Sequence, residues 1–358
     1  MSQSFAHRII VWNWQERRFQ DVGTMAEFEA VLRNRYIRST LKLVDDLTTG
    51  SDHVFLVVSS VVKELPVHGP NVVVFLLDDE QFEVPRYAHR VGAIFKCFGE
   101  KPYLDRRLRM DGLQALILAR YLRCWGRWAA SSVAAWRAGD GARAPIHPIP
   151  IGYDDQVDLD PPPILTRDFD VGFEGSVGHA GTGGGLIASL GTPKQRSRAQ
   201  MVEVLTGYLA QRPNVKANLV TVATFWDSRN AGPVAYSQRL AQTKICLVPR
   251  GTLSETVRYY QALRYGCIAI AERQPGHWYL SGSPAVILDD WKDLPRTLDA
   301  LLGDPQTMEA MSKAALAWWR DRCAEEALAT YVVECLTGFE PSRVLTMDAL
   351  PPKEPVAA

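Results

Sequence analysis

The sequence predicts an α/β protein of two domains, each built on an open parallel sheet with helices on both faces. The chain has 358 residues, which is too long for one simple core and suits two domains of roughly 150 residues. Short β-branched apolar runs alternate with segments of helical spacing, as in a parallel sheet with crossover helices. A stretch at 139–163 contains six prolines and no periodicity, which is typical of a domain boundary.

The first domain is expected to span residues 1–150. Four β-branched runs bounded by turn residues predict buried strands: Arg8–Trp12, His53–Ser59, Asn71–Leu77 and Gly92–Cys97. Helical spacing predicts a helix over Thr24–Arg38, and either one long helix or two over Asp111–Ala138.

The second domain is expected to span 164–338, followed by a loose tail at 339–358. Its predicted strands are Asp170–Glu174, Ala217–Val222, Ile245–Val248, Cys267–Ala271 and Ala285–Leu288. Its predicted helices are Lys194–Gln211, Val234–Thr243, Ser254–Tyr265 and two further C-terminal stretches. Doubly wound sheets bind ligands at the carboxyl ends of their strands, so we expect the site in the cleft between the domains.

The amino-acid composition excludes some kinds of binding partner and cellular compartment. Basic and acidic residues both number 40, and this balance argues against a nucleic-acid partner. The six cysteines form no C-x-x-C pair, which favours a reducing compartment and a cytoplasmic protein. Arginines interrupt the most apolar long segment, Gly112–Ala138, so we expect at most a peripheral contact with a membrane.

The segment Lys244–Ile270 carries the strongest functional signal. Its sequence, KICLVPRGTLSETVRYYQALRYGCIAI, predicts a strand, a turn, a helix that Ser254 or Thr256 caps, and a second strand after Gly266. A helix N-terminus after a strand end binds anions, and arginine side chains match phosphate oxygens. The pattern favours a diphosphate and ribose site without a metal. The alternative is an ordinary strand–helix–strand unit with solvated arginines.

The run Cys246–Gly251 (CLVPRG), followed by Thr256-x-Arg258-x-x-Gln261-Ala262-Leu263-x-x-Gly266-Cys267-Ile268, resembles the exostosin-type glycosyltransferase motif CLxPRG-x4-S-x-R-x-x-E-A-L-x-x-G-C-I-P. The strong match covers about 27 residues. The resemblance implies a GT-B fold, in which two Rossmann-like domains face a cleft. It also implies metal-independent and usually inverting transfer from a nucleotide sugar, usually a UDP-sugar, with no other cofactor.

By position, the resemblance places Arg250 on the donor diphosphate with Arg258 in support, and Gly251, Ser254 and Thr256 beside them. The glutamate that holds the ribose in that family is Gln261 here. A carboxylate accepts two hydroxyl protons, whereas an amide offers one acceptor and one donor group. The donor therefore stays open. The expected acceptor is a hydroxyl of a glycan, glycolipid or glycoprotein.

A glycine-rich loop, Gly175–Gly185, follows the first strand of the second domain. We expect it to close over the donor phosphates, with Gly175 and His179 in contact, because glycine lets backbone amides approach closely. The alternative is a flexible connection without a ligand.

Asp78, Asp79 and Glu80 follow the apolar run at 72–77, at a strand's carboxyl end. An inverting transferase needs a base there, and Asp79 or Asp78 is the predicted base. A solvated acidic turn is the alternative. The pairs Asp168-x-Asp170 and Asp158-x-Asp160 match a metal-binding D-x-D, but such short patterns recur by chance, and no metal is expected.

Two further functions stay open at this stage. One is a retaining or fucosyl-type transferase with the same two-domain fold. The other is a non-catalytic module that binds a nucleotide or glycan, for which Gln261 is the hint.

Overall fold

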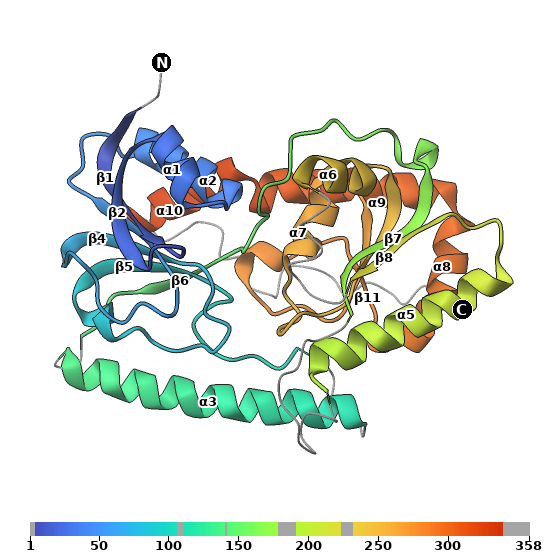
Figure 1. The fold of residues 1–358 in the computed structure, drawn as a ribbon, viewed down its shortest axis with the longest axis horizontal. Coiled ribbons are helices and arrows are strands. Elements are labelled where there is room, and N and C mark those ends of the chain that lie inside the picture. Colours follow the sequence, from blue (N-terminus) through green and yellow to red (C-terminus); the bar gives the residue numbers. More distant parts are fainter. Residues whose placement is uncertain (1–3, 106–110, 140–141, 178–190, 223–231, 339–358) are drawn as a thin grey trace.

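The computed structural model describes residues 4–105, 111–139, 142–177, 191–222 and 232–338. Two sheets lie side by side, each with helices on both faces, and one cavity is lined from both (Figure 1). The fold class predicted from the sequence is confirmed: an α/β protein with two Rossmann-like units facing a cleft.

The first sheet has the order β2-β1-β3-β4-β5-β6, and all neighbours run parallel except β1 and β2. Its strands are β1 (Ser4–Asn13), β2 (Arg18–Thr24), β3 (Val54–Val58), β4 (Gly69–Leu76), β5 (Val91–Cys97) and β6 (Ile146–Ile149). The four predicted strands are present, whereas β2 and β6 were missed. Edge strand β2 buries only Val22, and β6 is short, contains a proline and lies in the stretch expected to be a linker.

Helices cover both faces of this sheet. Helices α1 (Met25–Val31) and α2 (Arg35–Leu47) lie on one face, and α3 (Gly112–Ala138) on the other (Figure 1). The single helix expected over Thr24–Arg38 is wrong. Thr24 caps α1, Leu32 is extended, and the Asn34 side chain accepts a hydrogen bond from the Ile37 amide to start α2. The apolar spacing continues through both helices, so it predicted one helix, whereas the second N-cap at Asn34 starts a new one.

The second sheet has the order β11-β10-β9-β7-β8, with every neighbouring pair parallel. Its strands are β7 (Phe169–Ser176), β8 (Ala217–Val222), β9 (Thr243–Val248), β10 (Ile268–Ala271) and β11 (Val286–Ile287). The helices around it are α5 (Pro193–Gln211), α6 (Pro233–Ala241), α7 (Val257–Arg264), α8 (Leu294–Leu302) and α9 (Pro305–Trp318). The chain passes from β7 to β8 on one side of it, and then returns to form β9, β10 and β11 on the other side. The strand order therefore reverses between β7 and β9, where doubly wound sheets open a crevice for ligands.

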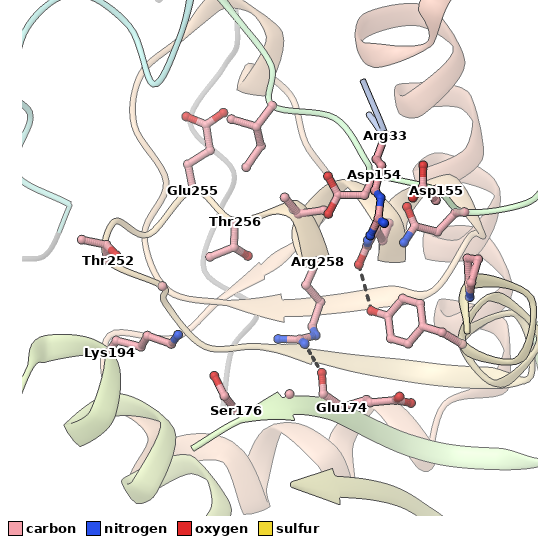
Figure 2. Close-up of a pocket in the computed structure, with 18 of the residues that line it drawn as sticks. Arg33, Asp154, Asp155, Glu174, Ser176, Lys194, Thr252, Glu255, Thr256 and Arg258 are labelled. Atoms are coloured by element: carbon pink, nitrogen blue, oxygen red, sulfur yellow. Dashed lines mark hydrogen bonds between the residues drawn. The ribbon is translucent and has the colours of Figure 1, made fainter. Parts of the chain in front are cut away.

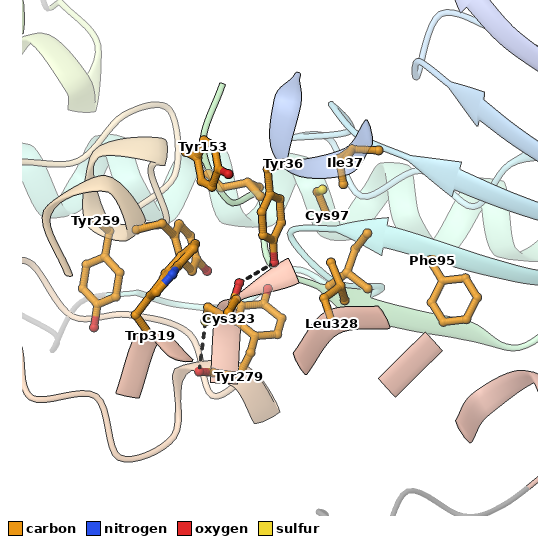
Figure 3. Close-up of a cluster of buried hydrophobic side chains, with 14 of the residues drawn as sticks. Tyr36, Ile37, Phe95, Cys97, Tyr153, Tyr259, Tyr279, Trp319, Cys323 and Leu328 are labelled. Carbon is orange, nitrogen blue, oxygen red and sulfur yellow. Dashed lines mark hydrogen bonds between the residues drawn. The ribbon is translucent and has the colours of Figure 1, made fainter. Parts of the chain in front are cut away.

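The last helix, α10 (Glu325–Leu336), returns to the first domain and packs on α2. At this junction the Tyr36 hydroxyl donates to the Cys323 carbonyl at 2.8 Å, and Leu328 and Trp319 belong to the same buried cluster (Figure 3). The buried cluster continues through Tyr153 in the connection between the sheets and Tyr279 in the second domain, so the two sheets share a packed junction and are not joined by a linker alone.

Candidate functional site

The main cavity has a volume of about 520 Å³ and lies at the strand reversal of the second sheet. Its floor is formed by Glu174, Gly175 and Ser176 at the end of β7, and by Gly251 and Thr252 after β9. Loop residues of the first domain and of the connection between the sheets contribute to the wall: Arg33, Glu80, Phe98, Ile151, Asp154, Asp155 and Gln156. A ligand in this cavity would touch both domains.

The segment that resembles a transferase motif forms β9, a turn, α7 and β10, as predicted. In the turn the Gly251 amide donates to the Leu253 carbonyl at 2.8 Å. Helix α7 begins at Val257, later than expected, because Thr256 is still extended at its N-cap. Gly266 ends the helix with a φ of +64°, which agrees with the C-terminal glycine expected there.

Besides Arg33 on the wall, three basic side chains of the second domain line the cavity: Lys194 and Arg198 from α5, and Arg258 from α7. Figure 2 shows Lys194 and Arg258. Within the described part of the chain none of these three has a carboxylate at ion-pair distance. Burial, together with the neighbouring Arg258, lowers the pKa of Arg198 to about 9. Burial and Arg198 also lower the pKa of Lys194. Lys194, Arg198 and Arg258 repel one another in a partly desolvated cavity, and a bound anion would reduce this repulsion.

Packing holds the Arg258 guanidinium in place. It lies over the Phe173 ring at 4.7 Å and donates to the Glu174 carbonyl. A Cβ atom on Gly175 would lie 2.6 Å from its Nη2 atom, so only glycine leaves room for this position. Gly175 and Arg258 both line the cavity, and their contact with a donor stays a prediction.

Gln261 also lines the cavity, and its exposed fraction is 6%. Its Oε1 atom accepts a hydrogen bond from the Tyr236 hydroxyl at 2.8 Å. The amide Nε2 group remains as the donor that can meet a ligand oxygen, since a ribose hydroxyl can accept as well as donate.

The structure places Arg250 elsewhere than expected. Its exposed fraction is 1%, and it does not line this cavity. Its two terminal nitrogens bind both carboxylate oxygens of Asp105, at 3.2 and 2.8 Å, and Glu272 lies 3.6 Å away. The fork expected to hold a phosphate is thus occupied by a carboxylate from the first half of the chain. Sequence reasoning missed Asp105 because nothing near it forms a motif.

Of the two hydroxyl residues in the motif, Thr256 and Ser254, only Thr256 lines the cavity. The Oγ1 atom of Thr256 is buried without a partner in the described structure. Ser254 is buried outside the lining, where its amide donates to Asp105 at 3.0 Å. His179 lies outside the described residues.

Neither carboxylate predicted as the base faces the cavity. Asp78 accepts from the Ser59 hydroxyl and the Ser60 amide. Asp79 is 2% exposed and forms an ion pair with Lys96 at 2.8 Å. The next residue, Glu80, does line the cavity, and burial raises its pKa. The order of residues after β4 could not show which carboxylate turns towards the second domain.

Glu255 is another carboxyl group on the cavity wall that no motif indicated. Its Oε1 atom accepts from the Tyr260 and Tyr279 hydroxyls, at 2.6 and 3.0 Å. Burial raises its pKa to about 7 in spite of these donors. The carboxyl group can therefore gain or lose a proton near neutral pH.

One aspartate of each D-x-D pair is engaged in ion pairs. Asp170 binds Lys244 at 2.7 Å, and Asp158 binds Arg35 and Arg264. Across the described ranges no three potential metal ligands cluster. Metal-independent chemistry remains a prediction.

No protein-family model matches the chain, and no curated protein is similar to it in sequence. Among solved structures, it is similar to the pneumococcal O-GlcNAc transferase GtfA in complex with UDP and GlcNAc, at 10% identity and a TM-score of 0.41, over 76% of this chain and 57% of that chain. It is also similar to Anabaena HepE in complex with UDP, at 14% identity and a TM-score of 0.39, over 74% and 78% of the two chains. Sucrose-phosphate synthase from Thermosynechococcus elongatus matches at 13% identity and a TM-score of 0.42, over 85% and 77%. The chain spans less than two thirds of GtfA. Similarity of this size carries no functional argument, so the function is argued from the cavity.

Proposed function

We propose that this protein is a glycosyltransferase that moves a sugar from a nucleotide-sugar donor to a hydroxyl of a glycan, glycolipid or glycoprotein. A UDP-sugar is the first donor to test. One observation carries the proposal: Lys194, Arg198 and Arg258 converge on a cavity at the strand reversal, and in the described structure none of them has a carboxylate at ion-pair distance. A diphosphate supplies the negative charge and the number of acceptor oxygens that such a group of donors can satisfy.

The cavity also offers a place for each remaining part of the donor. The N-terminus of α7 faces it at Thr256 and Val257, and helix N-termini stabilise anions. Gln261 lies one turn further along the helix and presents its amide to a ribose hydroxyl. The wall from the first domain and the connection between the sheets is left for the sugar and the acceptor.

The chemistry follows from this arrangement. The bond between the anomeric carbon and the diphosphate oxygen breaks, and a bond forms between that carbon and the acceptor oxygen. The leaving nucleoside diphosphate gains charge, which the three cations stabilise more strongly than they stabilise the donor. The acceptor hydroxyl gives its proton to a carboxylate. We assign this role to Glu80, which lines the cavity close enough to Lys194 for the two charges to affect each other's pKa.

The binding test uses a panel of UDP-, GDP- and CMP-sugars. Lys194→Met and Arg258→Met should each weaken nucleotide binding by about 10-fold to 100-fold, the usual loss for one charge-assisted contact. Lys313→Met, on an exposed part of α9, is the matched control and should bind as the parent does. Failure of every nucleotide to bind below millimolar concentration would refute the proposal.

The catalytic test compares two neighbouring carboxylates. Glu80→Gln should lower turnover by a factor on the order of 100 or more without changing nucleotide affinity. Asp79→Asn changes the ion pair with Lys96 and should act on stability instead. Equal turnover in Glu80→Gln and the parent would remove Glu80 as the base. Tight nucleotide binding with no turnover on any acceptor would favour a non-catalytic module, to which the amide at Gln261 points.

A further inference from the structure

Helix α3 (Gly112–Ala138) presents a surface that the proposed reaction does not use. It runs along the outside of the molecule beneath the first sheet, with its N-terminal end reaching towards α5 (Figure 1). Its inner face is held by buried residues, including Ile117, Cys124 and Ala135. The opposite face is therefore fixed towards solvent and cannot be hidden by rotation of the helix.

That outward face carries a line of apolar and small residues, which we call the apolar stripe: Leu118, Leu122, Gly126, Ala129, Val133 and Trp136. Steps of three or four residues keep these positions on one side of a helix, over a length of about 27 Å. The larger side chains are strongly exposed, with 60% for Leu122, 48% for Val133 and 62% for Trp136. Exposed apolar surface that is continuous along a helix usually marks a contact site.

A second line runs beside the stripe and carries Arg123, Arg127 and Arg137, which we call the arginine line. Arg127 lies 3.5 Å from Glu83 in an exposed pair, whereas Arg123 and Arg137 have no carboxylate at ion-pair distance in the described structure. With Arg120, the helix holds four basic residues and no acidic one, although the whole chain has zero net charge. The helix is thus a local concentration of positive charge next to an apolar surface.

We propose that α3 lies flat on the surface of a bilayer that contains anionic lipids, with the apolar stripe in the headgroup region and the arginine line on lipid phosphates. Amphipathic helices with arginine beside exposed Trp and Leu bind membranes in this way. The helix does not cross the bilayer, since none of the described helices is long and apolar enough to do so. Symmetric pairing of two copies through the stripe is less favourable, because it would bring two arginine lines close together.

The test measures co-sedimentation of the full chain with vesicles of phosphatidylcholine, alone or mixed with phosphatidylglycerol. The parent should bind the mixed vesicles, and salt should weaken the binding. Arg123→Gln with Arg137→Gln should weaken it about 30-fold, at about 1 kcal/mol for each arginine. Leu122→Ser with Trp136→Ser should weaken it by at least as much, since two large side chains leave the headgroup region.

Ile287→Ser with Leu316→Ser is the matched control, because these two exposed apolar residues lie in the second domain. It should bind as the parent does, and all variants should keep the parent's melting temperature. No binding of the parent to mixed vesicles, or binding that survives both α3 double variants, would overturn the proposal. So would a dimer in light scattering that the Leu122 and Trp136 changes dissociate, since it would assign the stripe to a second copy. The vesicle test needs no nucleotide, so its outcome is independent of the proposed transferase activity.

Discussion

The ion pair between Arg250 and Asp105 leads to the sharpest prediction, because sequence and structure give Arg250 different roles. Its partner carboxylate is 3% exposed, and the two side chains meet through two hydrogen bonds of 2.8 and 3.2 Å. If Arg250 joins the domains, Asp105→Leu must destabilise the protein although Asp105 lies outside the main cavity. If Arg250 binds phosphate, that change should matter much less than loss of the arginine.

The magnitude follows from burial. Removing one partner of a buried pair leaves an unpaired charge and costs about 3–5 kcal/mol. Glu272, at 3.6 Å, remains beside Arg250 in Asp105→Leu, so we expect about 3 kcal/mol. In a domain of this size that loss lowers the melting temperature by about 6–12 °C. Arg250→Met should cost a similar amount. The double variant should cost clearly less than the sum, since an apolar pair replaces the buried charges.

The assay is urea and thermal unfolding of the parent, both single variants and the double variant, with UDP binding measured on each. Arg8→Met is the control, because its pair with Asp21 has similar geometry but is more than half exposed, and its loss should change stability by less than about 1 kcal/mol. Additive single effects would refute the structural role of the pair. So would an Arg250→Met protein that unfolds like the parent but no longer binds UDP.

Three further outcomes follow. Gly175→Ala should weaken nucleotide binding several-fold, because the new Cβ would lie 2.6 Å from the Arg258 Nη2 atom and displace it, which isothermal titration can measure. Gly207→Ala, within α5 and with no atom within 4 Å of the new Cβ, should instead stabilise the protein by about 0.5–1 kcal/mol in urea unfolding without changing nucleotide affinity. Folding raises the pKa of Glu255 from 4.5 to about 7, so its stabilising contribution is complete below pH 4.5 and is lost as pH rises through about 7. In stability measured across this window, Glu255→Gln should remove a pH-dependent loss of up to about 3 kcal/mol; an unchanged pH profile would contradict this assignment.

Local signals in the sequence were sufficient for the elements of the second sheet. Its five strands were each predicted within a few residues. The central strands β9 and β10 are short apolar runs, because burial on both faces leaves a continuous apolar pattern. The errors lie where no such pattern exists. Strand β2 buries one residue and is held by its hairpin with β1 at the sheet edge. Strand β6 contains a proline and pairs with β5, which is distant in the sequence.

The sequence by itself determined the strand, turn and helix of 244–270, the glycine at position 266, and the presence of Arg258 and Gln261 on one helix face. These features depend on local spacing and backbone preference. Only the tertiary structure decided that Arg250 binds Asp105, that Glu80 rather than Asp79 turns to the cavity, and that Lys194 and Arg198 join Arg258 there. Those outcomes depend on which charged side chains come together between the two domains when the chain folds and excludes water. Because these side chains lie far apart in the sequence, no local sequence pattern predicts which of them will meet.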